Sequence, residues 1–203
     1  MSYQGDIEIV FDASSFKSSK HQRPSRAGNT TVDVWYIGAN RDLNPQPLTL
    51  EKDFFLQCIR DVVRTLPQSR TSISQMLGLV RAAWDLYHTV EQNIRLLNVS
   101  FPTEVRKTGD EAVAVVSTVL VRELKTKVEV TLGLRGRVSV QGVEVVVVPE
   151  AMVVYGEGFN PVKMTEFLRG RVGERVKQGG ESWCGALVEL HAKLLARGRK
   201  EQK

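Results

Sequence analysis

Hydrophobic positions follow two spacings along the chain, and each spacing predicts a different kind of secondary structure. Alternating apolar and polar residues and runs of β-branched residues indicate strands, whereas apolar residues at steps of three and four indicate helices. Strands are predicted at Asp6–Asp12, Thr30–Ile37, Val99–Val105, Ala112–Glu123, Lys127–Leu134 and Val143–Tyr155. Helices are predicted at Thr49–Leu66, from Ser72 to Leu97, from Asn160 to Val176 and from Ser182 to Leu194.

The ends of several helices are marked by capping and breaking residues. Thr49 is placed to cap the first helix, and Pro67 ends it, because proline disfavours helical geometry in the residue before it. Asn160 is followed by Pro161, a residue well suited to the first helical position. The segment from Ser72 to Leu97 has the strongest helical pattern, with apolar residues at steps of three, four and seven.

The strands after residue 99 differ in which faces they can bury. Lys127–Leu134 alternates strictly, so one of its faces is expected to be buried and the other to be wetter. The adjoining segment Ala112–Glu123 is expected to pair with it as an antiparallel hairpin that turns near residues 124–126. Val143–Tyr155 is apolar on both faces at residues 145–148, and Pro149 predicts a bulge or a sheet edge there.

The order of these elements predicts an α+β fold. From Ser72 onward a helix is followed by three or four antiparallel strands and two helices, which favours helices packed on one face of a meander. Residues 1–66 hold two strands and one helix, which resemble either a reduced version of the same plan or half of a domain. The predicted division is therefore a small domain at 1–66 and a larger one at 67–203.

Composition narrows the functional class only slightly. The chain has 203 residues and a formal net charge of +5, which permits nucleic acid, anionic membrane or acidic protein partners. Its two cysteines are too few for a disulfide framework or a four-ligand zinc site. The longest apolar run, Ala112–Val121, is too short to cross a bilayer, and the first residues do not form a secretion signal.

No catalytic constellation emerges from the sequence, so we expect no enzyme, cofactor or metal site. The chain has three histidines and no pair at metal-ligand spacing; His88 and His191 are expected to face solvent or to have structural partners. Residues 156–158 (Gly-Glu-Gly) predict a tight turn rather than a phosphate-binding loop. The cations are spread over residues 17–26, 122–137 and 197–203, and glutamates are interleaved with the middle group.

Five blocks of sequence, in order, resemble the C-terminal region of the fungal kinetochore scaffold, the Spc/KNL-type large subunit of the outer-kinetochore KMN network. The blocks are PLTLEKDFFLQCIR (47–60), LPQSRTSI (66–73), STVLVRELKTKVEVT (117–131), VVYGEGFN (153–160) and ARGRK (196–200). The resemblance implies tandem RWD domains, each an antiparallel β-meander packed on helices, the first one reduced. It also implies a location in the nucleus, at the kinetochore on the centromere.

The resemblance implies a non-catalytic interaction module. Such a module docks the scaffold onto the MIND complex through the C-terminal tail of a MIND subunit, and so contributes to microtubule attachment and spindle-checkpoint signalling in chromosome segregation. Other KMN subunits would be contacted through regions upstream. RWD folds are related to ubiquitin-conjugating enzymes, but Cys58 and Cys184 lie in predicted helices, which argues against conjugation. The alternative interpretation is a basic nucleic-acid-binding domain at the centromere.

Two strand edges and the cleft between the predicted domains are candidate sites for a partner's tail. Tails bind by adding a strand to an open sheet edge or by laying a helix in a groove. One candidate edge is the strand Val99–Val105, which ends beside two cations, and the other is Val143–Tyr155. The predicted partner-binding residues are Val99, Phe101, Val105, Arg106, Lys107, Val153 and Tyr155.

Overall fold

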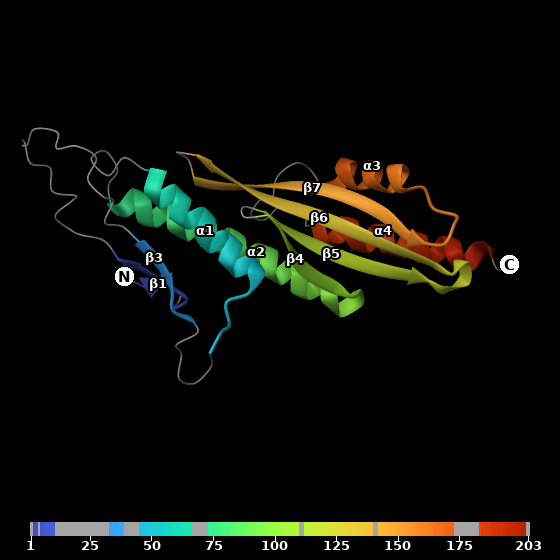
Figure 1. Ribbon diagram of the computed structural model, residues 1–203, viewed down its shortest axis with the longest axis horizontal. Helices are drawn as coiled ribbons and strands as arrows, with labels where there is room; N and C mark the ends of the chain where they lie inside the picture. The colour runs from blue at the N-terminus through green and yellow to red at the C-terminus, as the bar shows by residue number, and fades with distance from the viewer. Residues whose placement is uncertain are drawn as a thin grey trace, which may run out of the picture. The chain divides into compact units, whose positions relative to one another are not determined.

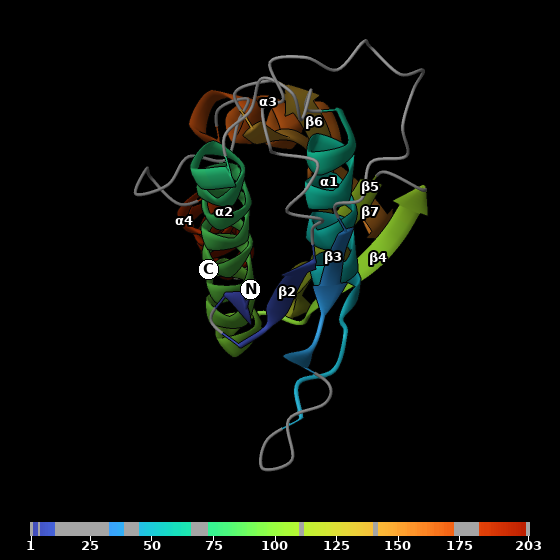
Figure 2. The same cartoon turned by 90° about the vertical axis from the view of Figure 1, so that its left-hand side faces the viewer.

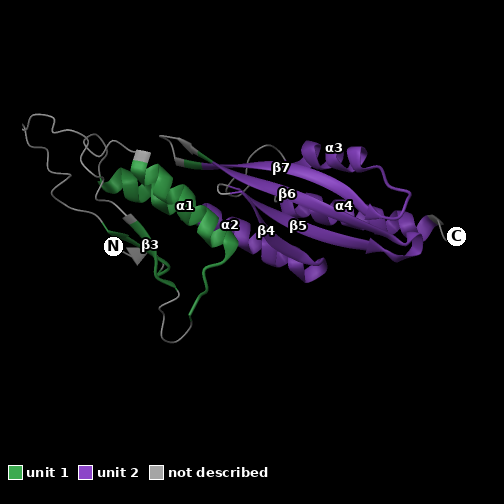
Figure 3. Cartoon of the chain, in the orientation of Figure 1, with its two compact units in different colours: residues 1–84, 137–143 green, residues 85–136, 144–203 purple. Residues whose placement is uncertain are grey.

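The computed structural model describes the helices, the strands and part of the connections. The described residues are 2–3, 5–10, 33–38, 45–65, 73–109, 112–139, 142–172 and 183–201. Their contacts group the chain into two compact units, unit 1 (residues 1–84 and 137–143) and unit 2 (residues 85–136 and 144–203), which Figure 3 shows in different colours. The division falls inside a helix, whereas the sequence predicts a boundary between residues 66 and 67, and that boundary stays a prediction.

Unit 1 contains a three-stranded antiparallel sheet. Its strands are β1 (Ser2–Tyr3), β2 (Ile7–Val10) and β3 (Asp33–Tyr36), in that order across the sheet. β2 and β3 fall within the predicted strands at Asp6–Asp12 and Thr30–Ile37, and β1 was not predicted because two residues are too few to show alternation. Residues 11–32, which include the basic segment at 17–26, lie outside the described part of the chain.

Helix α1 (Leu50–Thr65) lies against β3, as Figures 1 and 2 show. The Thr49 hydroxyl accepts the backbone N–H of Lys52 at 3.5 Å, in agreement with its predicted capping position. The Arg60 Nε donates to the Val34 carbonyl at 3.0 Å, which ties the helix to the sheet. The core between them is apolar and includes Ile7, Ile9, Val34, Phe55, Ile59 and Val62.

Helix α2 (Ile73–Ser100) is 28 residues long and continues from unit 1 into unit 2. It ends three residues later than predicted, so Val99 is helical. The strand predicted at Val99–Val105 begins instead at Thr103, because helical hydrogen bonding extends to the Phe101 N–H, which donates to the Leu97 carbonyl at 2.9 Å.

Unit 2 is built on a four-stranded meander (Figure 1). Its strands are β4 (Thr103–Gly109), β5 (Ala112–Val121), β6 (Thr126–Ser139) and β7 (Gly142–Tyr155), and their spatial order equals their order in the chain. β5 and β6 are antiparallel, with Val121 opposite Thr126, so the predicted hairpin is confirmed. The short 3-10 helix η3 (Arg122–Leu124) and the left-handed residue Lys125 make its turn.

Two helices follow the meander, α3 (Pro161–Val172) and α4 (Trp183–Glu201). The Asn160 side chain accepts the backbone N–H of Val162 at 2.9 Å and caps α3 as predicted. α4 lies against β5, η3 and α3, and it covers the face of the sheet to which the fully buried Val121, Val130 and Leu132 belong. Antiparallel sheets packed on helices confirm the predicted α+β class. Within the described residues no helix has both the length and the apolar character to span a membrane.

Candidate functional site: an open strand edge in unit 2

Five of the seven predicted partner-binding residues lie on strands at opposite edges of the sheet in unit 2. The strand order β4-β5-β6-β7 places Val105, Arg106 and Lys107 at one edge, and Val153 and Tyr155 at the other. Two more predicted residues precede β4: Val99, 85% exposed in the last turn of α2, and Phe101, half-buried in the connection. The seven predicted residues therefore do not form one surface, and the two edges are separate candidates.

The edge at β4 presents unused backbone groups. The Thr118 N–H donates to the Pro102 carbonyl at 2.9 Å, and Thr103 stands opposite Ser117. Because antiparallel pairs alternate between hydrogen-bonded and non-hydrogen-bonded, the N–H and C=O of Val105 point away from β5. No described strand lies on that side of β4. Val105 therefore offers a donor and an acceptor to an incoming chain.

The start of β4 is closed by the chain itself. The Thr103 N–H also points away from β5, and it donates to the Asn98 Oδ1 at the end of α2, at 3.1 Å. The Thr103 hydroxyl donates to the Phe101 carbonyl at 2.8 Å. These bonds fix the connection between α2 and β4, so the part of the edge that remains open begins at Val105.

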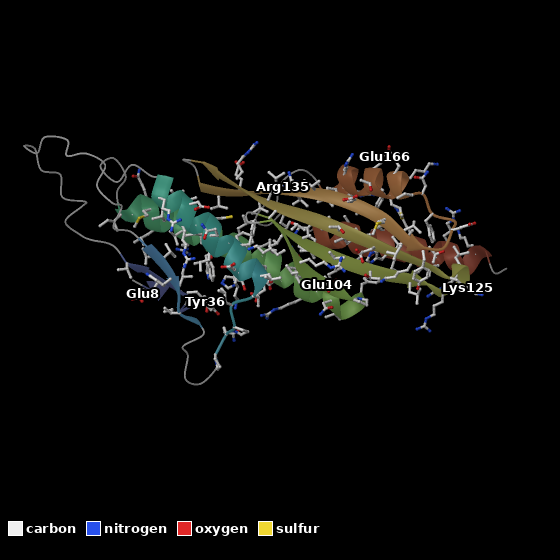
Figure 4. All side chains as sticks on the ribbon, in the orientation of Figure 1. Glu8, Tyr36, Glu104, Lys125, Arg135 and Glu166 are labelled. Atoms are coloured by element: carbon white, nitrogen blue, oxygen red, sulfur yellow. The ribbon has the colours of Figure 1, made fainter. Side chains whose placement is uncertain are left out.

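Arg106 is exposed but already paired with carboxylates of the same sheet. Its guanidinium pairs with Glu104 on the same strand and with Glu129 on β6, where the nitrogen–oxygen distance is 3.2 Å. The hydrogen bond that the Arg106 guanidinium donates to the Glu104 carboxylate is the main reason that the pKa of Arg106 is raised. Figure 4 labels Glu104 on this strand. Because Arg106 already has two carboxylate partners, it is a weaker anchor for an acidic tail than the sequence suggested.

The opposite edge, β7, is partly covered. The Ala151 N–H donates to the Thr165 Oγ1 of α3 at 3.0 Å, so this backbone donor is not open to a partner. Tyr155 is 51% exposed at the end of the strand, just before the turn at Gly156, whose φ of +89° suits glycine. The role of Thr165 was not visible in the sequence, because a threonine on a helix gives no sign of which strand it meets. Of the two edges, β4 is the more open.

The Phe101 ring packs against the ring of a buried histidine. Its ring meets the His191 ring of α4 edge to face, with centroids 4.3 Å apart. His191 is completely buried, and neither ring nitrogen has a hydrogen-bond partner among the described residues. Burial lowers the pKa of His191 to about 4. Of the two alternatives expected for His191, exposure to solvent is wrong; the ring is buried, and its structural partner is the Phe101 ring rather than a hydrogen-bonding group among the described residues.

Metal and thiol chemistry gain no support from the described residues. No group of three His, Cys, Asp or Glu side chains that could hold a metal ion occurs among them. Cys58 in α1 and Cys184 in α4 are both buried, as expected for thiols inside helices. The open groups at β4 are a backbone donor and acceptor, which can bind a chain but perform no reaction.

Antiparallel sheets packed against helices are consistent with an α+β fold of the RWD type. Residues 1–90 match the family model described as the Knl1 RWD C-terminal domain. The match supports a kinetochore-scaffold RWD region and confirms the resemblance to the kinetochore scaffold; a protein-interaction role at the kinetochore follows from it. The matched residues include β1–β3, α1 and most of α2, and the β4 edge follows them. No curated protein and no solved structure matches the chain.

Proposed function

We propose that this chain is a non-catalytic module in the nucleus that docks a kinetochore scaffold onto the MIND complex. The C-terminal tail of a MIND subunit would add as a strand beside β4. The observation that carries the proposal is the outward N–H and C=O of Val105 at an edge without a described neighbour. Through this docking the scaffold would contribute to microtubule attachment and checkpoint signalling, and other KMN subunits would bind upstream regions.

Strand addition suits the β4 edge physically. Main-chain hydrogen bonds supply affinity in this mode, and side chains on alternate positions supply specificity. Val105 is half-buried on the helix-covered face, so the side chain of a neighbouring residue on an added strand could share its apolar surroundings. The basic groups nearby would speed and orient an acidic tail more than they would tighten its binding.

The proposal is tested by removing one backbone donor. Val105→Pro deletes the outward N–H and leaves the bonds between β4 and β5 in place, because this N–H does not point toward β5. We expect the affinity for a peptide of the MIND subunit's C-terminal tail, measured by isothermal titration calorimetry, to fall by about tenfold or more. Val105→Thr is the matched control, since it keeps the N–H and the β-branched shape and should bind as the parent does.

Two results would contradict the proposal. Absence of heat with the parent chain at high peptide concentration would exclude docking of this tail. Equal affinities for Val105→Pro and the parent would exclude the β4 edge even if the tail binds. Circular dichroism spectra of the variants should match that of the parent, which separates loss of the donor from loss of the fold.

A further inference from the structure

The regular part of β4 is symmetric about Val105. β4 pairs with β5 without interruption from Thr103 to Lys107, and the register shifts after Lys107, so Val105 is the middle residue of this stretch. The N–H and C=O of Val105 point away from β5, and no described strand lies beyond β4 (Figure 1). A strand that is added antiparallel to β4 can therefore centre on this residue.

The two residues on either side of Val105 carry charges of opposite sign. Glu104 and Arg106 lie on the same face of β4, because side chains alternate along a strand, and they pair with each other. Their side chains are 58% and 50% exposed, so both lie within reach of a neighbouring strand. A strand that carries the same two charges in the opposite order would therefore gain two attractions at this edge.

A second copy of β4, running antiparallel, carries the charges in that order. Two copies related by a two-fold axis at Val105 place Glu104 of each copy opposite Arg106 of the other. Val105 then faces its own equivalent as a hydrogen-bonded pair. The charged residues occupy the non-hydrogen-bonded positions, where opposite side chains are closest. The four charges alternate in sign around the axis, and opposite-charge pairs across two strands stabilise a sheet.

The same charges disfavour the neighbouring two-fold registers. Only registers that place residues 103, 105 and 107 of the two copies opposite one another use the outward backbone groups of β4. A shift of two residues in one direction places Glu104 opposite its own equivalent, and the same shift in the other direction does so for Arg106. Like charges directly opposite one another destabilise a sheet. The charges therefore favour the register centred on Val105 over both of these.

The contact between two β4 strands is short. A stable protein interface buries about 800 Å² per partner, and the edge of one short strand supplies much less. The Thr103 N–H is already used by Asn98, so the central bonds are those between the two Val105 residues. We therefore expect pairing of this kind to be weak, reversible and dependent on the concentration of the chain.

We propose that β4 is a self-complementary edge, through which two copies of this chain pair as a reversible two-fold dimer. The two four-stranded sheets join into one sheet across the axis. Hydrogen bonds between the two Val105 residues hold the strands together, and the Glu104–Arg106 pairs across the axis set the register. The dimer and an added tail exclude one another, because Val105 has a single outward N–H and C=O.

The test compares charge variants of the complete 203-residue chain by sedimentation equilibrium. The parent chain should form a dimer at about 0.1–1 mM. Glu104→Arg and Arg106→Glu should each weaken dimerisation by about tenfold or more, because each places like charges opposite one another across the axis. An equimolar mixture of the two variants should dimerise again, since every charged pair across the axis is then of opposite sign.

Matched controls separate this contact from a general effect of charge. Glu166→Arg and Lys163→Glu change the net charge by the same amounts at exposed positions of α3, and both should dimerise as the parent does. Val105→Pro should abolish dimerisation, because it deletes the N–H that each copy donates at the axis. Circular dichroism spectra of all variants should match that of the parent.

Several outcomes would overturn the proposal. They include a parent chain that stays monomeric up to about 1 mM, unchanged dimerisation of either β4 charge variant, and a mixture that is no more dimeric than its two components. Equal weakening by the α3 variants would also overturn it. The result does not depend on the MIND tail, because no peptide is present. A tail peptide added afterwards should dissociate the dimer if it binds β4, and should leave the dimer intact if it binds elsewhere.

Discussion

His191 is a polar residue in a place where its polarity is not used. It is fully buried on α4 against the Phe101 ring, and its ring nitrogens have no hydrogen-bond partner among the described residues. Burial favours the neutral ring and lowers its pKa to about 4, from 6.5 in a solvated chain. The unfolded chain therefore binds a proton more readily than the folded chain does between these two values.

This difference predicts a loss of stability in acid. The contribution of neutral His191 is complete above pH 6.5 and is lost as the pH falls toward 4, where the free energy of unfolding should be lower by about 3 kcal/mol. His191→Leu removes the titrating group at similar volume, so its urea-unfolding free energy should fall less over this range. Parallel pH curves for the variant and the parent would contradict the prediction, and comparing the two cancels all other titrating groups.

At the scale of elements, the position of α4 depends on Gly198. The apolar periodic pattern of the helix does not account for a glycine at this position. A Cβ on Gly198 would overlap a methyl group of the buried Val121 and lie 3.2 Å from a Glu123 carboxylate oxygen. Gly185, on an earlier turn of the same helix, has no atom within 4 Å of the equivalent position. Gly198 thus permits the close approach of α4 to the end of β5.

The two glycines should respond oppositely to alanine. Gly185→Ala should raise the free energy of unfolding by about 0.5–1 kcal/mol, because alanine has the higher helix propensity. Gly198→Ala gains the same propensity but must displace α4 from β5, so a net loss of about 1–3 kcal/mol is expected. Urea unfolding of both variants measures the contrast. Stabilisation by both substitutions would show that the approach at Gly198 can relax.

The elements themselves were largely predictable from the sequence. Thr49 and Asn160 marked helix starts correctly, and the alternation in 127–134 identified the strand and its buried face. The predicted start of β4 was wrong because Val99, a β-branched residue, belongs to the end of α2. Val99 is also exposed, so it does not contribute to the apolar periodic pattern of that helix. The local sequence pattern cannot predict the secondary structure of such a residue when the hydrogen bonding of the preceding helix continues past it.

The candidate site was less predictable than the fold because its properties depend on residues distant in sequence. Glu129, 23 residues from Arg106, engages that cation, and Thr165, 14 residues from Ala151, covers the β7 edge. The sequence identified both edge strands, although it began the first of them too early, and only the three-dimensional structure distinguishes the open one.

At the scale of the whole molecule, the net charge of +5 raises the question whether a nucleic acid or an acidic protein is the partner. Among the described cations, Arg106 and Arg171 pair with carboxylates, and Arg197 lies over the Phe159 ring at 5.4 Å. Arg122, Lys125 and Lys127 are close in sequence at the β5–β6 turn, but Glu123 lies among them, so they do not form an uninterrupted basic surface. This distribution favours a protein partner.

Salt dependence separates the two partners. A protein that neutralises six to ten phosphates loses about 10³–10⁵ in affinity for DNA between about 50 and 200 mM salt, because counterions are released on binding. Strand addition at β4 relies on backbone hydrogen bonds and apolar burial, so affinity for the MIND tail should fall by less than about tenfold over the same range. Titrations of the full chain with the tail peptide and with a DNA duplex, each at several salt concentrations, measure both slopes. A steep slope for the duplex, with tighter binding than the tail at about 150 mM salt, would favour the centromeric nucleic-acid interpretation, because the cations of this chain would then act together rather than at separate surfaces.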